Sequence, residues 1–232
     1  MSRSLTQWIS LPVRILALIA MGSLVWRLAP GVFAAADAGG QTITWWASRA
    51  LGITAYIAIW LSMLFGLLVG AKGIEGLLGR KVLMDLHQQW SLAAVLATLL
   101  HVLTIVGHAV ESHVAPIAAI VPFTSRTLTA EVAMGTIAFW GLALISISSW
   151  LRSRIPYGLW RTLHALVFGT FLLALLHGIL GGTDSSAPWA QWMYLVTASL
   201  FAGTLTARIA VAMGRAGRPQ VDDDRETQSG AA

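Results

Sequence analysis

Residues 87–101 read HQQWSLAAVLATLLH, an apolar stretch that begins and ends with histidine. A second such stretch, HALVFGTFLLALLH, covers residues 164–177. Each lies within a longer apolar segment, 84–108 or 158–180, and a helix needs about 20 such residues to cross a hydrocarbon core of about 30 Å. Ionisable side chains are costly inside a membrane and are usually functional there. We therefore expect the four histidines at the ends of these two stretches to be functional residues of a membrane protein.

The rest of the chain has the composition of a membrane protein. Of its 232 residues, 56% are hydrophobic and 11% are charged, whereas about 25% of the residues in an average soluble domain are charged. Four further apolar segments accompany the two histidine segments. We therefore predict an all-α membrane protein, a bundle of six transmembrane helices with boundaries accurate to a few residues. The predicted segments are 11–29, 50–70, 84–108, 131–150, 158–180 and 190–212.

These segments predict one transmembrane domain, residues 1–213, followed by a disordered cytoplasmic tail, residues 214–232, that is rich in Gly, Asp, Arg and Ser. The first segment also resembles a cleavable signal peptide, whose removal would leave five spans, although Arg27 fits such a signal poorly. The glycine-rich stretch 70–79 follows no predicted strand and lacks the dinucleotide-binding fingerprint. We interpret it as a flexible cytoplasmic loop.

The distribution of basic residues predicts the orientation, because loops rich in Lys and Arg stay in the cytoplasm. With the N-terminus inside, twelve of the 15 Lys and Arg residues lie on the cytoplasmic side, and only Arg27, Arg49 and Arg126 lie outside. Both termini are then cytoplasmic. The net charge of +5 is explained in this way without a nucleic acid partner. We expect an integral protein of a bacterial cell membrane, in contact with lipid.

Tryptophans also mark the membrane boundaries. Most lie near the ends of the predicted segments, as in the aromatic belts of membrane proteins. Trp60 and Trp140 lie deeper, where we expect them to serve packing.

The histidine pairs predict a bound metal group. The chain has no cysteine, which excludes iron–sulfur clusters, thiolate zinc sites and covalent heme attachment. His87 and His101 are fourteen residues apart, and His164 and His177 thirteen, on segments that run in the same direction. At about 1.5 Å per residue, each pair spans about 20 Å, so the histidines fall at two shared depths. Imidazoles from two facing helices would fill both axial positions of a heme iron, and we predict two stacked b-type hemes.

One spacing conflicts with a regular helix. At about 100° per residue, fourteen residues return to within about 40° of the same face, but thirteen miss it by about 140°. We therefore expect segment 158–180 to tilt or to be distorted locally, near Gly169.

These features together resemble the ferric reductase-like transmembrane domain. The resemblance covers about residues 45–212 and rests on the six-span layout, the two histidine pairs, the sequence WRTLH at 160–164, and Arg49 at the start of the second segment. This superfamily includes NADPH oxidases, ferric reductases and the heme membrane subunit of the periplasmic methionine sulfoxide reductase system. The cytochrome b of quinol oxidoreductases has a similar histidine arrangement, but it would need more helices and a quinol-site loop that we do not find.

The resemblance implies an inner heme on His87 and His164 and an outer heme on His101 and His177. It also implies electron transfer from a cytoplasmic flavoprotein or a membrane quinone to an external acceptor, namely ferric iron, oxygen or a redox protein. The chain ends without the cytoplasmic flavin and nicotinamide-nucleotide domain of the oxidases and ferric reductases. We therefore expect an oxidoreductase subunit that needs a separate donor, with any flavin supplied by that partner.

A function of another class stays open at this point. The chain would then be a heme-binding scaffold, or a proton-coupled transporter that uses its histidines for protons. A visible absorption spectrum separates these classes, because two reducible low-spin hemes per chain support electron transfer and a colourless protein rejects it.

Basic residues near the membrane faces are candidates for holding the anionic heme propionates. Arg161, three residues before His164, and Arg80 and Lys81, shortly before His87, are candidates at the inner heme, with topological anchoring as the alternative for each. Arg49 opposes the charge rule and is the main candidate at the outer heme. Arg126 is a second one.

A polar group follows the outer histidine of the 84–108 segment. His108, Glu111 and His113 are candidates for contacting an external acceptor or binding a metal ion, with ordinary interfacial polarity as the alternative. Asp184 lies on the same side, where we interpret it as a solvated loop cap.

The charge distribution generates a test of the orientation. A reporter fused after Ala232 should read as cytoplasmic and one inserted near Ser112 as external, because the basic loops are retained inside. Topology-dependent reporter activity in intact cells measures this. The reverse result would exchange the inner and outer labels of both hemes.

Overall fold

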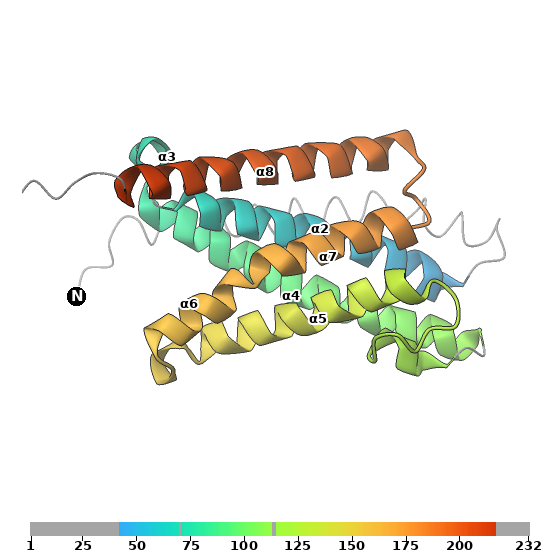
Figure 1. Ribbon diagram of the computed structural model, residues 1–232. Helices are drawn as coiled ribbons and strands as arrows, with labels where there is room; N and C mark the ends of the chain where they lie inside the picture. Colours follow the sequence, from blue (N-terminus) through green and yellow to red (C-terminus); the bar gives the residue numbers. More distant parts are fainter. Residues whose placement is uncertain (1–41, 70, 113–114, 217–232) are drawn as a thin grey trace, which may run out of the picture.

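The computed structural model describes residues 42–69, 71–112 and 115–216, and every regular element in these ranges is helical (Figure 1). The longer helices are α2 (Ile43–Leu68), α4 (Arg80–Glu111), α5 (Thr129–Trp150), α7 (Val167–Gly181) and α8 (Pro188–Ala216). The shorter ones are α3 (Lys72–Leu78), α6 (Tyr157–Ala165) and the two 3-10 helices η1 (Pro116–Ala119) and η2 (Arg152–Arg154).

Five helical stretches are long and apolar enough to cross a membrane, with α6 and α7 counted as one. They confirm the all-helical prediction and the last five predicted segments. The first predicted segment, 11–29, lies outside the described residues. So does the predicted tail from residue 217 on, while α8 continues to Ala216.

The stretch 70–79 differs from the flexible loop that we expected, because it contains helix α3. Gly79 ends this helix with a φ of 80°, a left-handed conformation that glycine adopts without a steric cost. The chain can therefore turn directly from α3 into α4.

The spans form two antiparallel pairs, α2 with α4 and α5 with α7, and α8 packs against α2 (Figure 1). One end of the bundle carries α3 and η2, and we call it the η2 end. The other carries η1 and the turn between α7 and α8, and we call it the η1 end.

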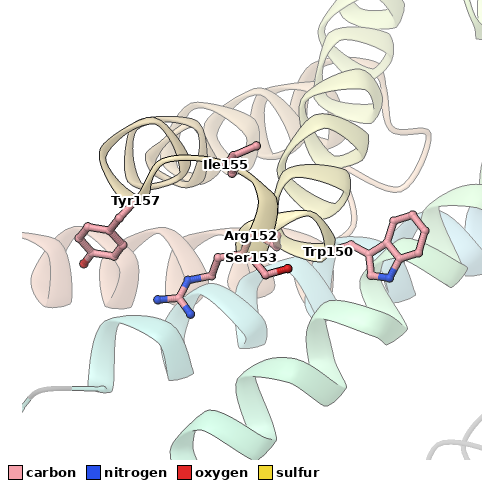
Figure 2. A pocket seen from close by; sticks show the side chains of 6 residues that line it. Trp150, Arg152, Ser153, Ile155 and Tyr157 are labelled. Atoms are coloured by element: carbon pink, nitrogen blue, oxygen red, sulfur yellow. The ribbon is translucent and has the colours of Figure 1, made fainter.

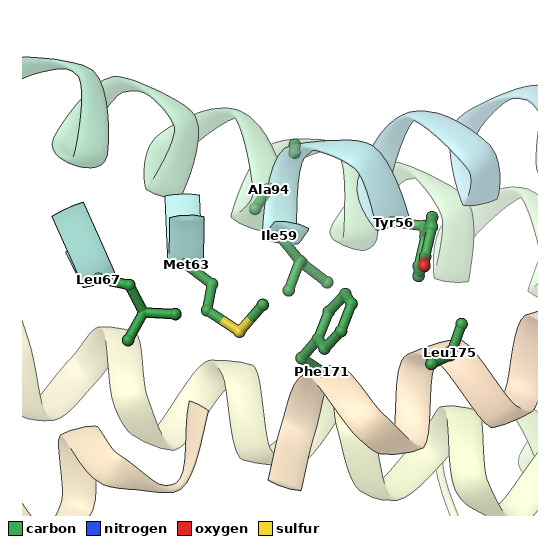
Figure 3. Packing of buried hydrophobic residues seen from close by; sticks show 8 residues of the cluster. Tyr56, Ile59, Met63, Leu67, Ala94, Phe171 and Leu175 are labelled. Carbon is green, nitrogen blue, oxygen red and sulfur yellow. The ribbon is translucent and has the colours of Figure 1, made fainter. Parts of the chain in front are cut away.

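The core lies between α2 and α7 (Figure 3). Ile59 and Met63 of α2 point toward Phe171 of α7, whose side chain is fully buried. Tyr56 stacks on Phe171 with 5.7 Å between the ring centres, and its hydroxyl hydrogen-bonds to Thr197 of α8. These contacts join three helices at the middle of the bundle.

Most other large apolar side chains face outward, as expected for helices surrounded by lipid tails, where burial alone gives little driving force. Trp60 packs against the core as predicted, and its indole donates to the Thr197 carbonyl at 3.2 Å. Trp140 differs from the prediction: its side chain is half exposed and donates to the Ile120 carbonyl at 2.8 Å, which ties α5 to the segment after η1.

The distortion expected in segment 158–180 is present and falls at Leu166, between α6 and α7. The Leu166 amide donates to the Leu163 carbonyl, three residues back, at 3.1 Å. This tighter turn changes the direction in which the following residues point. We had expected the break near Gly169, and it lies three residues earlier, at Leu166.

The core predicts a stability difference between two neighbouring residues. Phe171→Ala should lower the free energy of unfolding by about 3 to 5 kcal/mol, because it leaves a cavity where three helices meet. Leu172→Ala is the matched control, since Leu172 is 47% exposed. Thermal unfolding in detergent measures both, and an equal loss in the two variants would contradict the assignment of this core.

Candidate functional site

Four of the six histidines occupy the two depths predicted for them. At the η2 end, His87 of α4 faces His164 of α6, with 6.0 Å between the ring centres and 76° between the ring planes. At the η1 end, His101 of α4 and His177 of α7 are close enough to interact electrostatically. The break at Leu166 allows α6 and α7 together to present both of their histidines toward α4.

Three of these histidines are anchored in the same way. The Nδ1 of His87 bonds to the Ser62 carbonyl at 2.8 Å, that of His101 to the Ser48 carbonyl at 2.7 Å, and that of His177 to the Glu131 carbonyl at 2.8 Å. A carbonyl oxygen only accepts, so Nδ1 carries the proton and donates it in each case. The other nitrogen, Nε2, then has a free lone pair and can bind a metal.

A glycine on the facing helix makes each anchor possible. A Cβ built on Gly66 would lie 3.1 Å from the ring of His87, one on Gly52 2.9 Å from that of His101, and one on Gly135 2.8 Å from that of His177. In every case the accepting carbonyl belongs to the residue four positions before the glycine. In a helix that carbonyl points toward the amide of the glycine itself. A side chain at the glycine position would therefore block the approach of the imidazole.

His164 is held differently. Its Nδ1 lies 3.5 Å from the hydroxyl of Ser149 on α5. The ring of Trp160, one turn earlier on α6, stacks on the imidazole with 5.0 Å between centres and 23° between planes.

Each end of the bundle also has an arginine over a tryptophan. Arg49 lies 4.4 Å from the ring centre of Trp46 at the η1 end, and Arg152 lies 4.7 Å from that of Trp160 at the η2 end. Both indole nitrogens are buried without a hydrogen-bond partner in the described part of the chain. A buried N–H group without an acceptor is costly, so these two indoles are donors available to an acceptor.

Beside the pair at the η2 end lies a cavity of about 420 Å³, lined by residues from the end of α5, from η2 and from the start of α6. Arg152 and Tyr157 lie on one side of the connecting turn and Trp150 on the other (Figure 2). Ser149, which contacts His164, also lines the cavity.

Arg49 forms a contact that was not predicted from the sequence. Its Nε donates to Asp184 at 3.0 Å, and its Nη2 contacts the second carboxylate oxygen. We had expected Asp184 to be a solvated loop cap, but its carboxylate binds Arg49 of α2. The pair is partly buried and joins α2 to the turn between α7 and α8. The role predicted for Arg49 at an outer propionate stays a prediction.

The other basic candidates are exposed. Arg161 lies on α6 with His164, Arg80 lies 3.6 Å from Glu75, and Lys81 and Arg126 also lie at the surface. Their predicted roles remain untested. Arg152 is the arginine that the structure brings to the aromatic residues around His164, and it was not among the residues predicted from the sequence.

His108 and Glu111 belong to a small polar group at the η1 end. The Nδ1 of His108 bonds to the Thr42 hydroxyl at 2.9 Å, its ring lies 5.1 Å from that of Trp45, and Glu111 accepts from Thr44. Their partner in the prediction, His113, lies outside the described residues. Among the described residues, no group of three or more His, Cys, Asp or Glu could hold a metal ion.

Comparison with known proteins identifies a family. The family described as "Ferric reductase like transmembrane component" matches residues 50–180, more than half of the chain. The matched region contains all four of the paired histidines. No curated protein and no solved structure matches the chain.

The glycine contacts generate a prediction with an internal control. Gly135→Ala should displace His177 and break its bond to the Glu131 carbonyl, because the new methyl group would overlap the ring, and it should reduce the content of the heme predicted from the sequence. Gly169→Ala is the control, since apart from its chain neighbours and the backbone of its own helix nothing lies within 4 Å of a Cβ at that position. Heme content per chain after purification measures the difference. Equal heme content in both variants would show that the glycine is not needed.

Proposed function

Since this chain belongs to the ferric reductase-like transmembrane family, we propose that it is the heme-carrying subunit of a membrane oxidoreductase and transfers electrons across the bilayer. The observation that carries this proposal is the shared anchoring of His87, His101 and His177. Each donates its Nδ1 proton to a backbone carbonyl and keeps Nε2 free. A hydrogen bond at the distal nitrogen is the usual support of a metal-binding imidazole.

The spacing at the η2 end fits a six-coordinate iron. An iron bonded to one nitrogen of each ring, at about 2 Å per bond, needs ring centres roughly 6 Å apart. The centres of His87 and His164 are 6.0 Å apart. We assign these two residues to one heme and His101 with His177 to the other. A bound heme supplies a one-electron carrier at each depth.

The remaining polar groups fit the acidic edge of a heme. The unpaired indole N–H of Trp160 and the guanidinium of Arg152 would hold a carboxylate at the η2 end, and Trp46 with Arg49 would do so at the η1 end. Arg49 already bonds Asp184, but its guanidinium has five N–H groups, so a second carboxylate can share it. Arg161 remains a further candidate at the η2 end.

We assign the η2 end to the cytoplasm, because Arg80, Lys81, Arg152, Arg154 and Arg161 lie there. Electrons would then enter near His87 and His164, from a cytoplasmic flavoprotein or a membrane quinone. They would leave near His101 and His177, to ferric iron, oxygen or an external redox protein. Because two histidines would hold each heme, a donor or acceptor would meet the heme edge.

The test is the spectrum of the purified chain and of single histidine variants. The wild-type protein should contain two low-spin b-type hemes that dithionite reduces. His87→Ala or His164→Ala should lose mainly the inner heme, and His101→Ala or His177→Ala the outer one, because each loss removes an axial ligand.

His108→Ala is the matched control, because His108 lies on the same helix as His87 and His101 but bonds Thr42. It should keep both hemes. A wild-type protein without heme would refute the proposal and favour a transporter, whereas a paired-histidine variant with two unchanged hemes would refute that ligand.

A further inference from the structure

Three histidine sites follow one pattern, and the fourth departs from it by one side chain. On α2, Gly52 and Gly66 are fourteen residues apart and face His101 and His87. On α5, fourteen residues after Gly135 comes Ser149, which contacts His164. Ser149 therefore occupies the position that glycine holds at the other three sites.

The backbone at this fourth site is also different. The carbonyl four residues before Ser149 is that of Ile145, and it accepts the Ser148 hydroxyl at 2.9 Å. At the three glycine sites a Cβ would lie 2.8 to 3.1 Å from the imidazole, so the Cβ of Ser149 is expected to keep His164 from the carbonyl in the same way. His164 consequently has the Ser149 hydroxyl, at 3.5 Å, as its hydrogen-bond partner on α5.

We propose that Ser149 is a positioning residue that tunes His164 as an iron ligand. This inference rests on the proposed function. With Nε2 of His164 assigned to the iron, its Nδ1 carries the proton and donates it to the Ser149 hydroxyl. This contact, at 3.5 Å, is longer and therefore weaker than the bonds of the other three histidines to carbonyls, which are 2.7 to 2.8 Å long. A strong bond at Nδ1 makes an imidazole more basic and stabilises the oxidised iron. His164 therefore stabilises its ferric iron less than a carbonyl-anchored histidine would.

The position of Ser149 limits this effect to one heme. Its side chain contacts His164 and lines the cavity at the η2 end, together with Arg152 and Tyr157. The outer ligand on the same helix pair, His177, faces Gly135, fourteen residues before Ser149, and bonds the carbonyl of Glu131, eighteen residues before it. A change at Ser149 should thus alter the inner heme and leave the outer heme unchanged.

The test compares the midpoint potentials of both hemes in the purified, heme-loaded full chain by spectroelectrochemistry. The inner heme is the one that His164→Ala removes. Ser149→Ala deletes the hydroxyl but keeps the Cβ, so the inner potential should rise. Ser149→Gly opens the path to the Ile145 carbonyl, where the imidazole would replace the Ser148 hydroxyl, so the inner potential should fall below that of the wild type. A potential that rises in Ser149→Ala and falls in Ser149→Gly is specific to an effect of the hydrogen bond at the His164 Nδ1.

Two further variants provide a rescue and a control. Ser149→Thr keeps a hydroxyl and should retain the wild-type inner potential and low-spin electron paramagnetic resonance signal. Ser146→Ala removes a hydroxyl that bonds the Leu142 carbonyl of its own helix at 2.7 Å, and it should change neither heme.

The outcomes separate this inference from the proposed function. Suppose that the wild type contains two hemes. An inner potential that is unchanged in Ser149→Ala, or that shifts in the same direction in the Ala and Gly variants, would then overturn the role of Ser149 but leave the proposed function intact. If Ser149→Gly lost the inner heme, the Ala and Thr variants would test the role of Ser149. A raised inner potential in Ser149→Ala together with a wild-type potential in Ser149→Thr would support it, and equal potentials in these two variants would overturn it. A wild-type chain without heme would refute the proposed function, and the role of Ser149 with it.

Discussion

The hydrogen bond from a histidine Nδ1 to a backbone carbonyl of the neighbouring helix is the constraint on which this bundle depends. A histidine in a membrane must satisfy its N–H group inside the protein, because lipid offers no partner. The carbonyls of a helix already accept from their own helix, but an oxygen has two lone pairs and can accept twice. At Ser48, Ser62 and Glu131 that second bond fixes the distance, register and rotation of the two paired helices together. The histidine rings can approach these carbonyls only because the facing residues, Gly52, Gly66 and Gly135, have no side chain.

The sequence predicted five membrane-spanning helices well, for a physical reason, while the role of the four histidines as heme ligands stays a prediction. Long apolar segments have few alternatives in a bilayer, and four histidines at two depths within such segments have few structural explanations. The distortion of the 158–180 segment also followed from spacing alone, since thirteen residues cannot return to the same helix face. The location of the distortion at Leu166 could not be predicted from the spacing. A helix can change direction without a glycine, and the tightened turn at Leu166 contains none.

The contacts between helices could not be predicted in the same way. The glycines at 52, 66 and 135 are separated from their histidines by 49, 21 and 42 positions in the sequence, so their importance depends on which helices pair and in which register. A spacing of fourteen residues between Gly52 and Gly66, equal to that between His87 and His101, was the available signal. The Arg49–Asp184 pair was missed for a related reason: the sequence places both residues on one side of the membrane but does not bring them together.

The anchored histidines have a consequence for how the protein matures. An imidazole in solution exchanges its proton between two nitrogens, and metal binding selects one of the two forms. At His87, His101 and His177 the carbonyl makes that selection as the helices pair, so that the polypeptide itself fixes the proton before any iron arrives. Insertion of the proposed hemes would then require no proton transfer at these three residues. Assembly of the helices and loading of the hemes would be separable events.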